Sequence, residues 1–312
     1  MTYAARRPPV VPLDSIERIR PISEREFALF QTLIQREAGI YLAPAKKALL
    51  VGRLCKRLRA LGLTTFGAYY QRIVDEDDRE ERVQMLDCIS TNETHFFREP
   101  RQFEFLERQV IPVWKERGPR VLRVWSAGCS TGEEPYSLAM MLLHHFPPGT
   151  GRQIEILATD ISSRVLARAA DAVWPIEKAE EIPFAYRRAF MLRGTGSQEG
   201  RMKASPEIRA LVRFERLNLN EEPYPVRGPF HLIFCRNVLI YFQAETKLKV
   251  IHHLLDVLAP DGLLFLGHAE SLNAVTDRVA TVVPTVYAHA KPSAKSKAQI
   301  RPAGVNVEAR TA

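Results

Sequence analysis

The sequence predicts a doubly wound α/β domain with a mainly parallel sheet, preceded by a small all-helical domain. From residue 121 onward, short apolar runs that end in small or polar residues alternate with helix-like segments. That alternation is expected when parallel strands are joined by crossover helices. Between residues 21 and 95, by contrast, apolar residues recur at the three- and four-residue spacing of amphipathic helices.

The helical domain is expected to begin with a helix near Ser23. Ser23 and Glu26 have the spacing of a capping box, and Gly39 is a helix stop. The next helix, PAKKALLVGRLCKRLRALGL, carries a stripe of leucines with basic residues beside it, so it is strongly basic and amphipathic. Further helical segments are TTFGAYYQRIV and the stretch that follows an acidic cluster and ends near residue 90.

Residues 96–118 are expected to form a linker to the α/β domain, which spans residues 119–290. Its predicted strands are VLRVWSAG, IEILATD, FHLIFCRN and LLFLGH, and a final apolar run, TVVPTVYAHA, is expected at the sheet edge. Residues 174–216 do not follow the strand–helix rhythm and contain a Gly-rich polar turn at residues 194–200. We therefore predict a small inserted antiparallel β-subdomain with a hairpin at that turn.

Composition narrows the class of protein. With 46% hydrophobic residues and no run of about eighteen apolar residues, the chain is expected to be globular and to lack a transmembrane helix. The N-terminus does not suit a secretory signal, so a cytoplasmic location is expected. The net charge of +8 would suggest a nucleic-acid partner, but much of the excess lies in residues 1–20 and 291–312, two tails expected to be disordered. The four cysteines are scattered, which predicts reduced thiols and no metal site.

The most informative stretch is WSAGCSTGEEPYS, residues 125–137, where a predicted strand turns into a helix. Small residues there let the backbone approach a ligand, as in the first βα turn of an open α/β sheet. The dinucleotide fingerprint is absent, and Glu133 and Glu134 would repel a phosphate at the start of the helix. Such carboxylates suit a cationic ligand such as S-adenosylmethionine, and Asp160, which ends the next strand, would accept hydrogen bonds from its ribose. The alternative is that these three acids only cap helices.

Together with STNETHFFRE, NLN, FCRNVLIYF and GHAES, these motifs closely resemble those of the chemotaxis receptor glutamate methyltransferases, the CheR family. The resemblance implies a Rossmann-like class I methyltransferase sheet, with S-adenosyl-L-methionine as cofactor and S-adenosyl-L-homocysteine as product. It implies methylation of glutamate side chains on the cytoplasmic helical bundle of methyl-accepting chemotaxis receptors. The protein is expected to be a monomer with no nucleic-acid partner and no direct membrane insertion.

The resemblance also implies roles for individual residues. Arg98 and Tyr241 are expected to orient the acceptor carboxylate, which is ionised at neutral pH and therefore needs alignment rather than a general base. Considered singly, Asn92 and Thr94 could instead be helix caps, Tyr241 a core aromatic, and Arg98 the partner of a nearby glutamate. The positions expected to bind the cofactor are Asn92, Thr94, Arg98, Glu134, Asp160, Asn218, Leu219, Arg236 and Asn237.

Two surfaces are expected to meet the receptor. Arg53, Lys56 and Arg57 share one face of the basic helix and are predicted to dock an acidic receptor helix, the alternative being a merely solvated face. The insertion corresponds to a subdomain that, in some family members, captures a receptor C-terminal peptide by adding it as a strand. The hairpin sequence leaves open whether this chain does so.

Two rival functions are kept open. NLNEEPYP faintly resembles the Asn-Pro-Pro-Tyr signature of amino-methylating nucleic-acid methyltransferases, although its asparagine is not adjacent to the Pro-Tyr pair. The other rival is a catalytically silent adaptor that binds receptors. The presence of Asn92, Arg98, Glu134, Asp160 and Asn237 argues against loss of the site.

Overall fold

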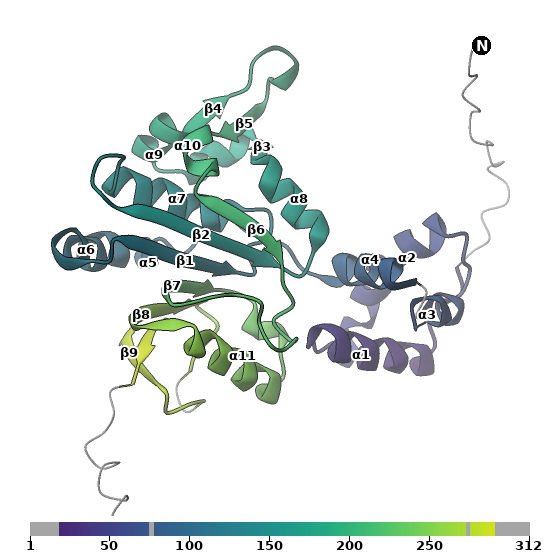
Figure 1. Ribbon diagram of the computed structural model, residues 1–312. Coiled ribbons are helices and arrows are strands. Elements are labelled where there is room, and N and C mark those ends of the chain that lie inside the picture. The colour runs from purple at the N-terminus through teal and green to yellow at the C-terminus, as the bar shows by residue number, and fades with distance from the viewer. Residues whose placement is uncertain (1–18, 75–77, 273–274, 291–312) are drawn as a thin grey trace, which may run out of the picture.

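The computed structural model describes residues 19–74, 78–272 and 275–290, and the two predicted tails lie almost entirely outside this range. A group of helices at the N-terminal end sits beside a larger α/β layer structure (Figure 1). The parallel strands point their carboxyl ends toward those helices. The site-bearing edge of the sheet therefore faces the N-terminal domain.

The N-terminal domain is all-helical, as predicted. The capping box is confirmed, because Ser23 Oγ accepts the Glu26 N–H at 3.2 Å and the Glu26 carboxylate accepts the Ser23 N–H at 2.8 Å. Gly39 ends the first helix with φ of 71°, which is the left-handed geometry of a glycine C-cap. The helices are α1 (Glu24–Ala38), η2 (Pro44–Lys46), α2 (Lys47–Ala60), α3 (Phe66–Val74) and α4 (Arg79–Ile89).

The leucine stripe of α2 forms part of this domain's core. Leu50, Leu54 and Leu58 are fully buried and pack with apolar residues of α1, α3 and α4. Tyr69 lies in the same core and donates its hydroxyl to Glu81 at 2.8 Å. Because all three leucines face inward, the basic residues of α2 are left on the other sides of the helix.

The main sheet has seven strands in the order β6-β2-β1-β7-β8-β10-β9. Strands β6, β2, β1, β7 and β8 are parallel, and β10 is antiparallel to both of its neighbours. The chain moves from β1 outward to β2 and β6, then returns to place β7 on the other side of β1. The strands are β1 (Val121–Ala127), β2 (Gln153–Asp160), β6 (Val212–Arg216), β7 (Phe230–Cys235), β8 (Leu258–Leu266), β9 (Val279–Val283) and β10 (Val286–His289).

Two hydrophobic clusters cover the two faces of this sheet. One cluster joins strand residues such as Leu122 and Phe234 to helix α7 (Glu133–His145). The other joins Trp125 and Ile233 to helix α11 (Ala244–Asp256). Helix α8 (Ser163–Asp171) packs near β2 and β6. This doubly wound arrangement confirms the predicted fold class and places a topological switch between β1 and β7.

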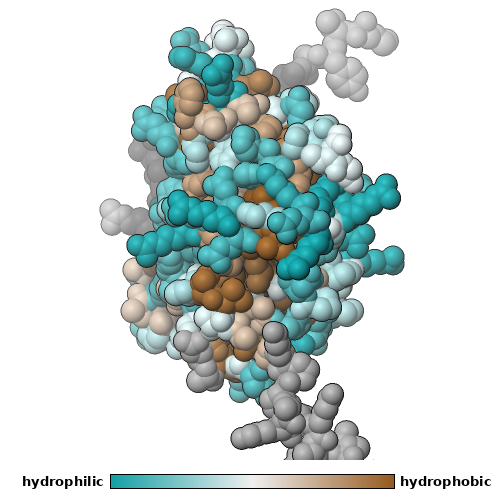
Figure 2. All heavy atoms as spheres, turned by 90° about the vertical axis from the view of Figure 1, so that its left-hand side faces the viewer, coloured by the Kyte–Doolittle hydropathy of each residue, from teal (hydrophilic) through white to brown (hydrophobic). Residues whose placement is uncertain are grey.

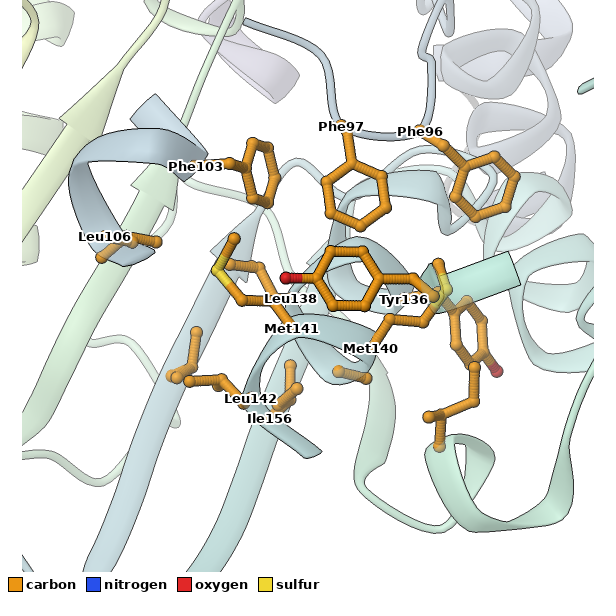
Figure 3. Packing of buried hydrophobic residues seen from close by; sticks show 14 of the residues in the cluster. Phe96, Phe97, Phe103, Leu106, Tyr136, Leu138, Met140, Met141, Leu142 and Ile156 are labelled. Carbon is orange, nitrogen blue, oxygen red and sulfur yellow. The ribbon is translucent and has the colours of Figure 1, made fainter. Parts of the chain in front are cut away.

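The predicted linker is mostly helical and belongs to the α/β layer. It contains α5 (Pro100–Phe105), a short π-helix (Leu106–Val110) and α6 (Ile111–Arg117). Figure 3 shows Phe96, Phe97 and Phe103 lying over the side chains of α7, and all of these belong to one buried cluster. The aromatic residues of the predicted linker thus pack this segment against the α/β domain.

The insertion forms a separate three-stranded antiparallel sheet in the order β3-β5-β4, with its hairpin tip at the predicted turn. One boundary differs from the prediction: residues 212–216 pair with β2 in the main sheet, so the insertion ends before them. Its elements are β3 (Val173–Pro175), η5 (Ile176–Glu181), α9 (Phe184–Phe190), β4 (Met191–Arg193), η6 (Gly196–Gln198), β5 (Arg201–Ala204) and α10 (Pro206–Arg209).

The final apolar run forms part of β9 and all of β10, and β9 is the edge strand of the sheet, as predicted for this run. The run differs from the prediction in forming two strands, with β10 between β9 and β8. Figure 2 views the face opposite the helical domain, where hydrophilic side chains surround one hydrophobic area. Among the described residues, no helix is both long and apolar enough to cross a membrane.

Candidate functional site

A pocket of about 350 Å³ lies at the carboxyl ends of the central strands. Its walls come from the loops after the strands, from residues 89–98, and from residues 38–53 of the helical domain. Lys56 and Arg57 are absent from the lining that the structure describes. The predicted site residues on the walls are Arg53, Asn92, Thr94, Arg98, Glu134, Asp160, Asn218, Leu219, Arg236, Asn237 and Tyr241.

The loop after β1 makes a tight turn into α7. The Gly128 and Cys129 N–H groups both donate to the Thr159 carbonyl, at 2.8 and 2.9 Å, which ties the loop to the end of β2. Gly128, Ser130 and Gly132 all have positive φ, at 91°, 49° and 95°. The small residues of the motif are therefore required by the backbone path, as the sequence indicated.

Gly128→Ala is expected to lower the free energy of unfolding by about 2–4 kcal/mol and to weaken cofactor binding. An added Cβ would lie 2.4 Å from Val238 Cγ2, in a backbone conformation that disfavours side chains. Gly149→Ala is the matched control, because Gly149 has φ of 93° but nothing within 4 Å of its added Cβ. The Gly149→Ala control should lower the free energy of unfolding by only about 1–2 kcal/mol, measured by urea denaturation. Equal losses for the two variants would contradict the close packing against Val238.

Asp160 is buried at the end of β2 and is held by two backbone groups. Its Oδ2 accepts the Ser130 N–H at 2.9 Å and its Oδ1 accepts the Ser162 N–H at 3.0 Å. Burial raises the pKa of this carboxyl, and the two N–H donors partly oppose that rise. Ser162, rather than Asp160, caps α8 with its side chain. Each oxygen of Asp160 keeps a lone pair for a ligand hydroxyl.

Glu134 forms a buried ion pair with Arg236 across the switch between β1 and β7. Arg236 Nε donates to Glu134 Oε2 at 2.7 Å, and Ser126 Oγ donates to the other oxygen at 2.7 Å. The same guanidinium donates to the Arg98 carbonyl and to Gln102 Oε1. Arg236 thus joins the first loop of the sheet to the segment that carries Arg98.

Glu133 also has its own cation. Its side chain is 1% exposed and accepts the Lys178 ammonium at 2.7 Å. Lys178 donates in addition to the Thr94 carbonyl at 2.9 Å. The sequence argument from two uncompensated carboxylates therefore needs correction, since Glu133 and Glu134 are each neutralised by a basic partner. Only Glu134 reaches the pocket wall.

The loop after β7 is organised by Glu270, which is 1% exposed. Its carboxylate accepts the N–H groups of Asn237, Ile240 and Gly267, at 2.8, 3.1 and 2.7 Å. Asn237 adopts φ of 60°, and its buried Oδ1 has no hydrogen-bond partner among the described residues. Asn237 therefore lines the pocket with an unsatisfied acceptor, which a ligand N–H or ammonium group could satisfy.

Asn218 connects the sheet to the helical domain. Its side-chain amide donates to the Glu37 carbonyl at 2.6 Å and to Glu221 Oε1 at 3.0 Å, while its Oδ1 accepts the Asn220 N–H at 3.1 Å. Leu219 is buried beside it and contributes apolar surface to the pocket. The Asn218 side chain thus links the loop after β6 to the C-terminal end of α1.

Segment 91–98 crosses the mouth of the pocket without helical structure. Asn92 and Thr94 are not helix caps, because α4 ends at the C-cap Ser90 and α5 begins after the N-cap Glu99. Their carbonyls accept the Ser130 hydroxyl and the Lys178 ammonium, respectively. Arg98 Nη1 donates to the Glu93 carbonyl at 3.1 Å. Within the part of the chain that the structure describes, Arg98 forms no ion pair with Glu99 or any other acid, so its charge stays available.

Tyr241 ends the short helix η7 (Leu239–Tyr241) on the pocket wall. Its carbonyl accepts the Tyr41 N–H at 2.8 Å, and Ile40 forms a β-bridge with Phe242. The residue is only partly buried, so it is not a core aromatic. These two backbone contacts join the loop after β7 to the helical domain at the pocket wall.

The three predicted docking cations occupy different environments. Arg53 is half-buried, lines the pocket and donates to the Ile89 carbonyl and to Thr91 Oγ1. Arg57 pairs with Glu81, which raises the pKa of its guanidinium. Lys56 is exposed. Only Lys56 thus keeps the position on an open surface that the sequence predicted for all three.

The sequence interpretation missed the partners that hold the site. Lys178, Ser130 and Glu270 were not selected, although Glu270 lies within the motif GHAES. The wall supplied by the helical domain, including Ile40 and Tyr41, was also missed. Ser130 and Glu270 lie within motifs that the sequence analysis selected, so both had a local signal. Lys178 and the wall from the helical domain had none, because their contacts join segments that are distant in the sequence.

The geometry fits S-adenosylmethionine at three points. Gly128 allows close approach of backbone, Asp160 keeps acceptors for ribose hydroxyls, and Asn237 has an unsatisfied acceptor that an ammonium group could occupy. The sheet, with antiparallel β10 inserted between β8 and β9, has the arrangement typical of class I methyltransferases. Fold and site together define an S-adenosylmethionine-dependent methyltransferase.

Comparison with known proteins then gives the family. Residues 25–90 match the model described as "CheR methyltransferase, all-alpha domain" and residues 92–288 match "CheR methyltransferase, SAM binding domain". The chain belongs to the CheR family of chemotaxis methyltransferases, and it methylates its substrate at the expense of S-adenosylmethionine.

Similar proteins agree with this assignment over nearly their whole length. The chemotaxis protein methyltransferase of Escherichia coli (strain K12) is 37% identical over 279 residues, covering 89% of this chain and 95% of that protein. Chemotaxis protein methyltransferase 2 of Pseudomonas aeruginosa is 37% identical over 273 residues, 86% of this chain and 94% of that protein. The Borreliella burgdorferi protein is 31% identical, with 85% and 94% covered.

Proposed function

We propose that this protein, acting as a monomer, transfers the methyl group to glutamate side chains of chemoreceptors as a γ-glutamyl methyl ester. The observation that carries the proposal is the set of ionisable side chains that line the pocket. Its described lining contains no histidine and no cysteine, but it includes Arg98, whose guanidinium has no acidic partner. The buried carboxylates Glu134 and Asp160 in the lining are held by hydrogen bonds, and the cation of Arg98 is available, which suits an acceptor that is already an anion.

When bound, the cofactor supplies an electrophilic methyl group on a sulfonium. Arg98 would hold the acceptor carboxylate in line with that methyl, and Tyr241 would donate a hydrogen bond to the same group. The new C–O bond forms as the S–CH₃ bond breaks, so no proton has to be removed. Orientation is expected rather than full neutralisation, since a tight ion pair would lower the nucleophilicity of the carboxylate.

The test is transfer of labelled methyl from S-adenosylmethionine to purified cytoplasmic fragments of candidate receptors. An ester releases its label as methanol in mild alkali, whereas an N-methyl or amide-type product keeps it. Alkali-stable label would overturn the glutamate assignment. Strong salt-dependent binding of DNA or RNA by a tail-deleted chain would revive a nucleic-acid substrate.

Affinity for S-adenosylhomocysteine is expected to fall in mild acid because of Asp160. Its ionised form accepts the ribose hydroxyls, and burial raises its pKa, so protonation begins at a higher pH than for an ordinary aspartate. Binding should be full above this raised pKa and be lost as the pH falls through it. Calorimetric titrations across this range should show the loss, while Asp160→Asn should bind weakly at every pH. Constant wild-type affinity down to about pH 4 would remove Asp160 from the site.

Lys56→Glu is expected to lower receptor methylation about threefold to tenfold at low ionic strength, with less effect in high salt. Lys56 is the exposed member of the predicted docking group, while Arg53 and Arg57 are engaged within the protein. Arg117→Glu, a charge reversal at an exposed position in the last turn of helix α6, is a control on a surface outside both proposed receptor contacts. If Lys56→Glu methylates the receptor at the wild-type initial rate at low salt, Lys56 does not take part in docking.

A receptor C-terminal peptide is proposed as a second contact. Strands β3 and β4 form the two edges of the small sheet, and an added peptide strand would pair with one of them. Calorimetric titration with receptor C-terminal peptides tests this contact. A flat titration would place the chain among family members that act without it.

A further inference from the structure

Arg98 lies in a strained turn of the backbone. Phe97 and Glu99, on either side of it, have φ of 51° and 60°, in the left-handed region that bulky side chains rarely adopt. Such a conformation costs free energy and persists only where surrounding contacts hold it. Strained residues are frequent at active sites, where they help to preorganise a functional group. The contacts that hold this turn therefore bear on the position of Arg98.

The insertion binds the backbone just before this turn. Glu181 of η5 accepts the Phe96 N–H at 2.8 Å, and its other oxygen lies 3.1 Å from His95 Nδ1. Lys178, three residues earlier in η5, donates to the Thr94 carbonyl at 2.9 Å. Two charged side chains of one short helix thus bind three consecutive residues of the segment that crosses the mouth of the pocket.

Aromatic contacts with the insertion hold the turn as well. The Phe97 ring stacks on Tyr186 of α9, with centroids 5.3 Å apart and planes 3° from parallel. Phe96 meets Trp174 of β3 edge to face, with centroids 5.0 Å apart. Both phenylalanine rings lie over α7 (Figure 3), whose Ser137 Oγ accepts the Phe97 N–H at 2.9 Å. The insertion therefore contacts the strained turn through η5, β3 and α9.

We propose that Glu181 is a positioning residue for methyl transfer, which fixes the Phe96 N–H, holds the strained turn and thereby directs the Arg98 guanidinium. The inference rests on the proposed role of Arg98 and deepens it, because it makes the insertion part of the catalytic apparatus. Glu181 itself is absent from the described lining of the pocket. The Arg98 side chain is bound only to the Glu93 carbonyl among the described residues, so its direction depends on the path of its backbone.

Glu181 is a better probe of this role than Lys178. Lys178 also neutralises Glu133, whose side chain is 1% exposed, so its removal would leave a buried charge and lower stability. The Glu181 side chain is 26% exposed. Its function as an acceptor can be kept or removed by separate substitutions, because Glu181→Gln retains a side-chain oxygen for the Phe96 N–H and Glu181→Ala retains none.

Glu181→Ala is expected to lower kcat for methylation of receptor fragments about 10- to 30-fold, since a small misplacement of an aligning group is costly. The affinity for S-adenosylhomocysteine should stay within about threefold of wild type, and the stoichiometry of that titration counts the folded protein. Glu181→Gln should recover kcat to within about threefold of wild type. Fragments that lack the receptor C-terminal residues are used, so that peptide capture by the insertion does not contribute.

The matched control is Glu116→Ala, which removes an exposed carboxylate from α6, outside the insertion and both proposed receptor contacts. It should keep the wild-type rate. A wild-type kcat for Glu181→Ala would overturn the inference and leave the proposed function intact. Glu181→Gln as slow as Glu181→Ala would overturn it too, because an acceptor for the Phe96 N–H would then not be the required feature.

A double-mutant cycle with Arg98→Ala tests whether Glu181 acts through Arg98. Adding Glu181→Ala to Arg98→Ala should slow methyl transfer by less than about twofold further, because the group that Glu181 directs is already absent. Losses that multiply would overturn the inference. Normal turnover by Arg98→Ala would overturn both the inference and the role of Arg98. Absence of label in every receptor fragment with the wild-type protein would overturn the proposed function itself.

Discussion

Arg98→Ala is expected to lower methyl transfer by about 100- to 1000-fold while the affinity for S-adenosylhomocysteine stays within a few-fold of wild type. Arg98 lines the pocket, and its guanidinium is bound only to the carbonyl of Glu93 among the described residues. Removing it leaves the other residues of the pocket wall in place but takes away the group that we propose orients the anionic acceptor. Loss of rate without loss of product binding is the signature of such a role.

The control for this variant is Arg101→Ala. Arg101 is exposed in the first turn of α5, three residues further along, and lines a different groove. It should methylate receptor fragments at nearly the wild-type rate, which separates the role of Arg98 from a general effect of positive charge in this segment. Near-normal turnover by Arg98→Ala would remove Arg98 from the mechanism.

Arg236→Met is expected to lower the free energy of unfolding by about 3–5 kcal/mol, measured by urea denaturation. Its side chain is 2% exposed and pairs with Glu134, which is 10% exposed. Without Arg236, the Glu134 carboxylate is left buried with Ser126 as its one hydrogen-bond donor among the described residues, and the Arg98 carbonyl loses the guanidinium that donates to it. The variant should also bind S-adenosylhomocysteine more weakly.

Two controls separate the buried charge from the rest of the substitution. The double variant Glu134→Gln with Arg236→Met removes both charges and should recover part of the lost stability. Arg123→Met breaks a pair with Glu155 in which both side chains are more than 40% exposed, and should change stability by less than about 1 kcal/mol. A loss below about 1 kcal/mol for Arg236→Met would show that the buried pair contributes little.

Local patterns predicted much of this fold. The capping box at Ser23 and the stop at Gly39 depend only on neighbouring residues, and the leucines of α2 face the core as their spacing indicated. The loop at Gly128 follows from small residues at the end of a strand. Each of these features is fixed by interactions within a few residues, so sequence alone identifies it.

Features that depend on distant partners could not be predicted in this way. Glu134 and Arg236 are separated by 102 positions, and no local pattern indicates that they pair. Arg57 was predicted to dock the receptor, but in the structure it pairs with Glu81, which is 24 positions away in the sequence. Strand β6 was assigned to the insertion because its residues do not form a continuous apolar run, although they pair with β2.

The helical domain supplies part of the cofactor pocket, through Ala38, Ile40 and Leu42, besides carrying the predicted docking helix. If α2 docks the receptor as proposed, receptor recognition and cofactor binding depend on the same domain. A chain cut back to begin near residue 92 would match a family model by itself, yet it would have one wall of its pocket open to water. A change made in the helical domain to alter receptor choice should accordingly be checked for its effect on cofactor affinity.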